Sequence, residues 1–143
     1  MRAVALPLAV SAQSSRPLYA ARPQRAILLL AALLALAGAS ILGQPAEAEP
    51  DLVRLLRFMA LIKGAFAVAA LAAGLWRLGR PVAGWRAAAY TLAPALMAGG
   101  ALALWRLVWP GPASLGLHLG LLAFLVAALT DRDFIPWPRR RTS

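Results

Sequence analysis

Four long stretches with almost no charge constrain the fold of this chain more than any other feature. They cover residues 26–43, 58–76, 87–104 (extending to 109) and 114–130. A helix of about 18 residues is about 27 Å long, close to the ~30 Å thickness of the hydrocarbon core of a bilayer. The sequence therefore predicts an all-α integral membrane protein with four transmembrane helices.

The composition agrees with a membrane environment. The 143 residues leave room for one domain, and 62% of them are hydrophobic, above the roughly 45–50% of soluble proteins. The net charge of +10 lies beside the apolar stretches, with neither zinc-finger spacing nor a separate basic helix. This placement favours anionic phospholipid as a partner over nucleic acid. The abundance of Ala and Leu, with Arg as nearly the only basic residue type, indicates a bacterial, GC-rich source.

The segments between and around the stretches predict the threading. Residues 1–25 form a basic arm that we expect to be disordered, and residues 131–143 form a basic tail. The link 44–51 is short, acidic and broken by two prolines, with Asp51 as the expected N-cap of the next helix. Pro110-Gly111-Pro112 is expected to turn the chain into the fourth helix. Links this short predict antiparallel neighbours in an up-down-up-down bundle.

The positions of the basic residues predict the orientation. If the N-terminus is cytoplasmic, four basic residues fall on the outer side: Arg54, Arg57, Lys63 and Arg106. The other eleven of the fifteen fall on the cytoplasmic side: Arg2, Arg16, Arg22, Arg25, Arg77, Arg80, Arg86, Arg132, Arg139, Arg140 and Arg141. This bias places both termini in the cytoplasm and the protein in the bacterial inner membrane.

A different reading of the N-terminal region stays open. Arg22 and Arg25, the apolar run from Ala26 and an A-x-A pattern at 37–39 or 46–48 also resemble a secretory signal peptide. Cleavage there would leave three spans. The long segment before the run and its full spanning length favour an uncleaved first helix.

Small residues at four-residue spacing predict how the helices pack. Each stretch has such residues on one face, where helices in a bilayer can approach closely. The fourth carries the clearest example, a GxxxG continued by two alanines: Gly116, Gly120, Ala123 and Ala127. We expect this face to contact another helix, in a homodimer or in a membrane-protein partner. Pro94 is expected to kink the third helix.

Four cations near the outer side are candidate contacts for an anion or a lipid. Lys63 and Arg106 lie within membrane depth, each on the small-residue side of its helix. They could form an anion site, or they could extend to the outer interface and meet Glu47, Glu49 or Asp51. Arg54 and Arg57 are expected in the headgroup layer, with lipid phosphate or Asp51 as partners.

The residues that carry most enzyme chemistry are scarce. The chain has no cysteine and one histidine, and its five carboxylates lie outside the apolar stretches: Glu47, Glu49, Asp51, Asp131 and Asp133. The sequence therefore predicts no catalytic residues, no metal site and no cofactor, and the protein is not expected to be an enzyme. His118 is the only candidate ligand for a haem, and it faces away from the Gly116/Gly120 side.

The sequence thus favours a function in binding other membrane components over a catalytic function. The first candidate is an accessory or assembly component of a membrane complex that acts through helix–helix contacts. The alternative is a small oligomeric transporter or permease for a small or anionic solute that passes Lys63 and Arg106. A membrane enzyme or haem carrier that uses His118 ranks third.

Overall fold

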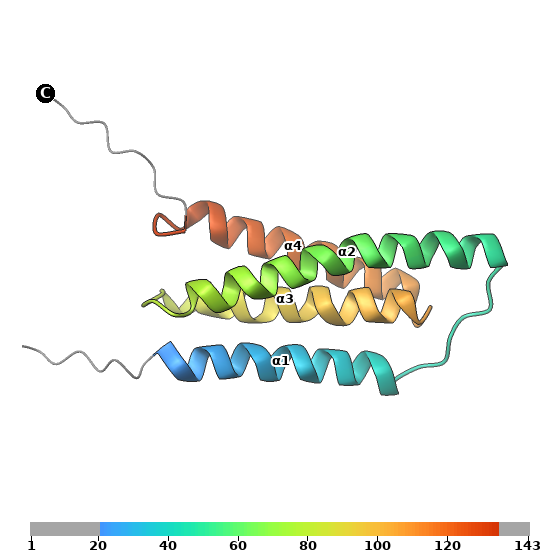
Figure 1. The fold of residues 1–143 in the computed structure, drawn as a ribbon, viewed down its shortest axis with the longest axis horizontal. Helices are drawn as coiled ribbons and strands as arrows, with labels where there is room; N and C mark the ends of the chain where they lie inside the picture. Colours follow the sequence, from blue (N-terminus) through green and yellow to red (C-terminus); the bar gives the residue numbers. More distant parts are fainter. Residues whose placement is uncertain (1–20, 135–143) are drawn as a thin grey trace, which may run out of the picture.

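The computed structural model describes residues 21–134, without the side chains of Ala21 and Arg22, and shows four helices there and no strand. The helices are α1 (Ala21–Ile41), α2 (Pro50–Arg77), α3 (Gly84–Trp105) and α4 (Pro110–Thr130). All four are long and apolar enough to cross a membrane. They alternate in direction, so the two ends of the described chain lie at the same end of the bundle (Figure 1). The up-down-up-down prediction is confirmed. Residues 21–25 of the expected disordered arm are helical and begin α1, while residues 1–20 of the arm and 135–143 of the tail lie outside the described residues.

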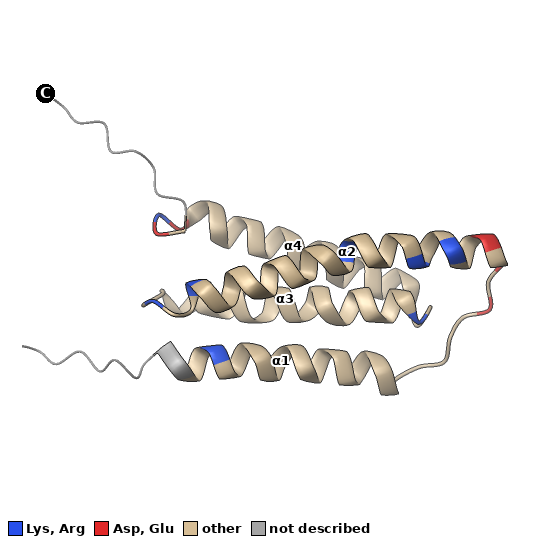
Figure 2. Cartoon of the chain, viewed as in Figure 1, with Lys and Arg blue, Asp and Glu red and all other residues tan. Residues whose placement is uncertain are grey.

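Charged residues collect where the helices end. The central stretches are almost free of them, while the links and helix termini carry most of the Arg, Asp and Glu (Figure 2). Large apolar side chains such as Leu33, Phe66 and Leu129 are exposed on the sides of the bundle. In water such a surface would be costly, whereas in lipid it costs nothing, because acyl chains are as apolar as leucine.

Helix α3 forms the centre of the bundle. It packs extensively against α1, α2 and α4, whereas α1 and α2 touch at few points. The short link between α1 and α2 therefore does not make them close neighbours, and α1 lies parallel against α3 instead (Figure 1). The largest apolar core cluster includes Leu28 of α1, Ala70 of α2, Met97 of α3 and Phe124 of α4.

Small residues permit these close contacts at α3. An added Cβ at Gly99 would lie 3.2 Å from the carbonyl oxygen of Ala35 in α1, and one at Gly120 in α4 would lie 2.8 Å from that of Ala93. Pro94 lies inside the continuous α3 and cannot donate a hydrogen bond to the carbonyl of Tyr90. Gly74 of α2 packs beside that carbonyl, where its added Cβ would lie 3.0 Å from the oxygen.

Two expectations about the links between helices are wrong. Asp51 is not the N-cap of α2, since Glu49 takes that place and Asp51 lies in the first turn. The turn between α3 and α4 comes before Pro110, which begins α4 because a proline at the first helical position loses no hydrogen bond. Leu107 and Trp109 have positive φ angles of 60° and 45° in this turn. The N–H of Ala46 in the α1–α2 link donates to the carbonyl of Leu107 at 3.0 Å.

Candidate functional site: a buried ion-pair cluster and the surrounding grooves

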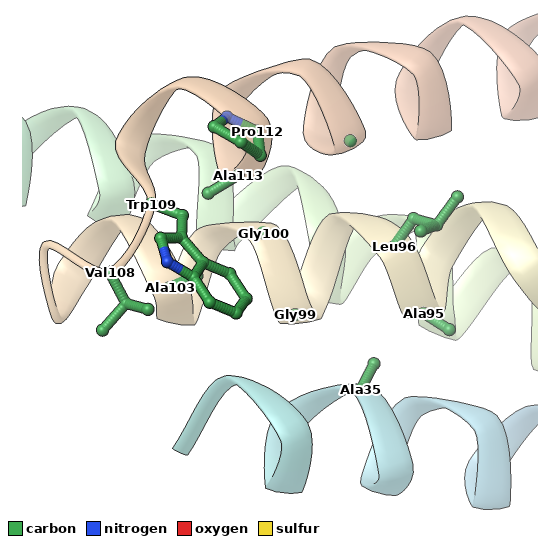
Figure 3. A pocket seen from close by; sticks show the side chains of 11 residues that line it. Ala35, Ala95, Leu96, Gly99, Gly100, Ala103, Val108, Trp109, Pro112 and Ala113 are labelled. Atoms are coloured by element: carbon green, nitrogen blue, oxygen red, sulfur yellow. The ribbon is translucent and has the colours of Figure 1, made fainter. Parts of the chain in front are cut away.

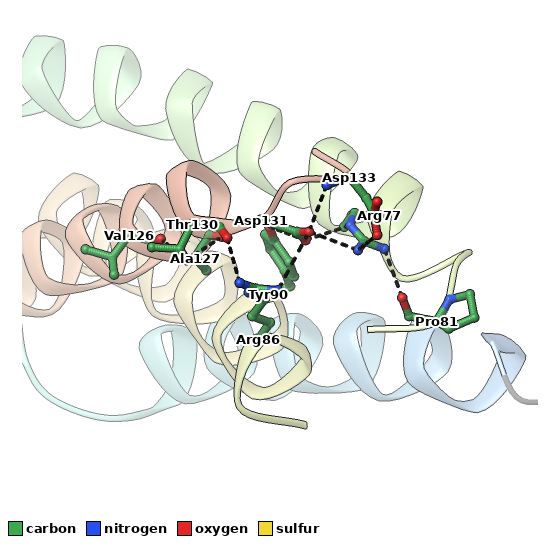
Figure 4. Close-up of polar contacts among 9 residues, drawn as sticks. All are labelled: Arg77, Pro81, Arg86, Tyr90, Val126, Ala127, Thr130, Asp131 and Asp133. Atoms are coloured by element: carbon green, nitrogen blue, oxygen red, sulfur yellow. Dashed lines mark hydrogen bonds and ion pairs between the residues drawn. The ribbon is translucent and has the colours of Figure 1, made fainter. Parts of the chain in front are cut away.

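A buried arginine–aspartate pair joins two helix ends. Arg77 is the last residue of α2, Asp131 directly follows α4, and each is only 2% exposed. The Nε of Arg77 donates to Oδ2 of Asp131 at 2.7 Å, and its Nη2 donates to Oδ1 at 3.1 Å (Figure 4). This two-pronged geometry is the strongest that an arginine and a carboxylate can form.

Further polar groups complete the shell of this pair. The hydroxyl of Tyr90 donates to Oδ2 of Asp131 at 3.1 Å, and the backbone N–H of Asp133 donates to Oδ1 at 3.2 Å. Arg77 also donates to the carbonyl of Pro81 and to the side chain of Asp133, both at 3.3 Å. An ionised carboxylate offers about four acceptor positions. All four are filled here by groups of this chain.

Arg86 adds a second cation to the cluster. Its Nη1 lies 3.9 Å from Oδ1 of Asp131, and its Nη2 donates to the carbonyl of Thr130 at 2.6 Å. The Nε of Arg86 is buried and has no hydrogen-bond partner among residues 21–134. The side chain thus fastens α3 to the last carbonyls of α4, where a positive charge is favourable.

Aromatic rings cover the cluster. The ring of Phe134 stacks on that of Tyr90 with centroids 6.0 Å apart, and its edge meets Trp76 and Phe124 at 5.9 and 6.3 Å. These rings come from α2, α3, α4 and the segment after α4. They exclude water from the ion pair, which strengthens its electrostatic attraction.

The environment keeps Asp131 ionised. Burial by itself would raise the pKa of this carboxyl, but the hydrogen bonds from Arg77, the backbone of Asp133 and Tyr90 outweigh it and lower the pKa below its usual value. A carboxylate with filled acceptor positions and a lowered pKa is poorly suited to take up a proton. The cluster joins α2, α3 and the end of α4 around an ionised Asp131.

The candidate cations are placed differently from one another. Arg106 does not extend to the acidic link: its Nη1 donates to the carbonyls of Ala39, at 2.9 Å, and Ser40 in the last turn of α1. Lys63 is half-buried and makes no hydrogen bond or ion pair with any residue between 21 and 134.

The two cations near the start of α2 are exposed. Arg54 pairs with Asp51 at 3.4 Å, one of the two partners expected for it. The guanidinium of Arg57 lies over the ring of Trp105, 5.7 Å from its centroid. His118 is exposed on α4, and its Nδ1 lies 2.6 Å from the carbonyl of Ser114, so that nitrogen is used within the helix.

The four small residues of the predicted packing face divide between two surroundings. Gly120 and Ala127 are buried, with Gly120 packed against α3. Ala123 is exposed, and a Cβ added at Gly116 would meet nothing within 4 Å. Part of the stripe therefore serves contacts within the chain, and contact of Gly116 and Ala123 with another chain stays a prediction.

Two apolar grooves flank α3. The α1–α4 groove, of about 280 Å³, is shown in Figure 3 and is lined by Ala35, Ala95, Leu96, Gly99, Gly100, Ala103, Val108, Trp109, Pro112, Ala113 and Gly116. The α1–α2 groove, of about 430 Å³, is lined by Leu36, Ala60, Leu61, Gly64, Ala65, Ala67, Val68, Leu71, Ala98, Ala101, Leu102 and Trp105. Neither lining includes a charged side chain.

The sequence did not reveal the Arg77–Asp131 pair. It showed two carboxylates, Asp131 and Asp133, beside many arginines at one predicted membrane face. That imbalance indicates that some arginine is paired but not which one, because the partners are separated by 54 positions.

The comparisons with known proteins found no match to a family model, to a curated protein or to a solved structure. Within residues 21–134 no group of three or more His, Cys, Asp or Glu side chains could hold a metal ion. The fold and the site are therefore described from the sequence and structure of this chain. They describe a small multi-pass membrane protein in which the buried ion pair of Arg77 and Asp131 is saturated by groups from the described residues.

Proposed function

We propose that this protein is an accessory or assembly component of a membrane complex, without catalytic chemistry of its own, that acts through helix–helix contacts. The observation that carries the proposal is the saturation of Asp131. The only buried acidic residue of the described part has its four acceptor positions filled by Arg77, Tyr90 and the backbone of Asp133. The surface, rather than the interior, is left to interact with other molecules.

The exposed part of α4 is the surface best suited to a partner helix. Gly116 lines the α1–α4 groove and has open space where a Cβ would be, and Ala123 is exposed two turns further along. Close approach of two backbones at small residues is the main source of helix association in lipid. A transmembrane helix of a partner, or of a second copy, would pack there.

We propose the bacterial inner membrane as the location, with both termini cytoplasmic. The support is the bias of eleven basic residues against four, counted over short segments. Reporter fusions after residue 25, within 78–83 and at the C-terminus should report the cytoplasm, and a fusion at 44–49 should report the exterior. A mature N-terminus at Ser40 or Glu49 would contradict a four-span protein.

Affinity purification in mild detergent tests the proposed contacts. The tagged wild type should retain a membrane protein or a second copy, and Gly116→Leu should lose it. Gly111→Leu is the matched control, because a Cβ at Gly111 also meets nothing within 4 Å. Equal recovery of partners from the two variants would remove Gly116 from the interface, and a wild type that is monomeric and alone would contradict the proposed function.

Transport of a small or anionic solute is the competing function. Lys63 favours it, because this half-buried cation has no ion-pair partner among residues 21–134. The hydrogen bonds of Arg106 to carbonyls of α1 do not favour it. Lys63→Met tests the difference. The accessory function expects unchanged expression and unchanged partner recovery, because loss of an unpaired ion at membrane depth relieves a desolvation cost. Solute uptake by vesicles of the purified protein, abolished by Lys63→Met, would support transport instead.

A further inference from the structure

The α1–α2 groove is a wedge that closes part-way across the bundle. Near the Asp131 end, α1 and α2 meet, since a Cβ added at Gly74 would lie 3.3 Å from the side chain of Leu28. Toward the other end the two helices diverge (Figure 1), and the groove opens between Leu36 of α1 and the stretch from Ala60 to Leu71 of α2. The twelve residues from Ala60 to Leu71 measure about 18 Å of helix. The groove therefore has the length of one leaflet, about half of the ~30 Å hydrocarbon core.

A cation lies at the open end of this wedge. Trp105 belongs to the groove lining, and the guanidinium of Arg57 lies over its ring at 5.7 Å from the centroid. Arg57 is exposed and makes no hydrogen bond or ion pair within residues 21–134. Twenty residues, or about 30 Å of helix, separate Arg57 from Arg77. If Arg77 lies at one boundary of the hydrocarbon core, Arg57 lies at the other, at the level of the phosphates.

We infer that the α1–α2 groove binds one anionic phospholipid, with an acyl chain in the wedge and the phosphate at Arg57. The occupant must be apolar along one leaflet, because the lining contains no charged side chain. It must also be anionic at its outer end, where Arg57 has unused donors. A transmembrane helix does not fit the length of the groove, since it would continue across the whole bilayer and collide with the contact of Leu28 and Gly74.

The site can be tested with the purified protein alone, so its failure would leave the proposed accessory function standing. The protein is reconstituted into bilayers that contain phosphatidylglycerol with a photoactivatable acyl chain, and labelled peptides are mapped by mass spectrometry. Label should concentrate on Leu36, Leu61 and Leu102. Ala65→Phe, a substitution at an exposed residue of the lining, should remove it, whereas the same change at the exposed Ala123 of α4 should not.

A second pair of variants tests the headgroup contact. Arg57→Gln should lower labelling by phosphatidylglycerol about fivefold, the factor expected for loss of one arginine near an anionic surface. Arg80→Gln is the matched control, because the exposed Arg80 also lies over a tryptophan, Trp76, at 4.6 Å but at the other end of the bundle. Equal labelling by phosphatidylcholine, label spread evenly over the exposed leucines of all four helices, or cross-links between two chains at the groove would each overturn the inference.

Discussion

Both ends of the bundle are fastened by an arginine, but the two arginines bind different groups. At the Asp131 end, Arg77 meets a buried carboxylate, and the contact joins α2 and α3 to the segment after α4. At the Arg106 end, the guanidinium meets backbone carbonyls of Ala39 and Ser40, and the contact joins α3 to α1. One end carries a compensated pair of charges, and the other carries a cation bound to dipoles.

Because the partners of the two arginines differ, we expect loss of the two contacts to lower the stability of the protein by different amounts. Removal of one partner of a buried ion pair leaves the other charge without compensation, at a cost of about 3–5 kcal/mol. Loss of a cation from backbone carbonyls costs less, about 1.5–3 kcal/mol for hydrogen bonds to a charged group. We therefore expect the Asp131 end to decide whether α2, α3 and α4 stay together, and the Arg106 end to decide only the position of α1.

Breaking the ion pair should give the largest effect. Asp131→Asn or Arg77→Met should each lower the free energy of unfolding by about 3–5 kcal/mol, because one buried charge loses its partner. Unfolding in mixed micelles with increasing dodecyl sulfate measures the change. The double variant Arg77→Met/Asp131→Leu should cost clearly less than the two single changes added together. Additive losses would show that the pair is not coupled.

Loss of the Arg106 contact should have a smaller and more local effect. Arg106→Gln should lower the free energy of unfolding by about 1.5–3 kcal/mol and loosen the last turn of α1. The chain has no cysteine, so Ser40→Cys provides a single site for maleimide labelling. Labelling should be faster when Arg106→Gln is combined with it, while a cysteine at the exposed Thr130 should react at an unchanged rate. Equal acceleration at both sites would contradict the separation of the two ends.

Two glycines of α2 sharpen the comparison along one helix. Gly74→Ala, near the Asp131 end, should destabilise the protein by about 1–3 kcal/mol, because its Cβ would press on the Tyr90 carbonyl at 3.0 Å. Gly64→Ala lies in the open groove, where the nearest atom is 3.9 Å away. It should stabilise α2 by about 0.5–1 kcal/mol through the lower backbone entropy of alanine. The same unfolding measurement tests both variants. A change in the free energy of unfolding of the same sign in both would contradict a wedge that is closed near Gly74 and open near Gly64.

The smallest effect concerns pH. The pKa of Asp131 is lowered in the folded protein, so between that value and the usual ~3.9 the unfolded chain binds more protons. The stabilisation is therefore complete above about pH 5, declines below about pH 4, and is lost as the pH falls through the folded pKa. One group contributes at most about 1.4 kcal/mol per pH unit. The stability of the wild type and of Asp131→Asn is measured as a function of pH, and the difference between the two profiles gives the slope due to Asp131. Identical profiles would show that Asp131 is not its source. The Arg106 contact involves no carboxylate and should not contribute in this range.

The number of helices, their approximate places and their alternating direction were predictable from local sequence. The length of an apolar stretch depends only on contiguous residues. A short link between two such stretches shows that the chain reverses its direction there. Element ends were less accurate: Asp51 was expected as the N-cap of the second helix, whereas α2 begins at Pro50. The helix starts eight residues before the apolar stretch 58–76, because amphipathic turns beyond the hydrocarbon core remain helical. The central place of α3 was not predictable, since small residues occur on every helix and several pairings suit them equally.

The candidate cations show the same division. The sequence located Arg106 near membrane depth, yet its partners are backbone carbonyls of α1, and every helix end offers such groups without any mark in the sequence. The contact of Arg54 with Asp51 was foreseeable because the two residues lie one helical turn apart. Contacts within a turn are fixed by helical geometry, whereas contacts between helices depend on rotation and depth.

The sequence by itself determined that this chain has four helices long and apolar enough to cross a membrane, with most charges at their ends, because apolar length depends only on local composition. The tertiary structure decided which of many arginines meets Asp131, which glycines face backbone, and which side of α3 remains open. Those outcomes depend on how the helices are rotated against one another. In lipid, that rotation is set by close packing at small residues and by pairing of the few buried charges, and both are cooperative properties of the assembled bundle.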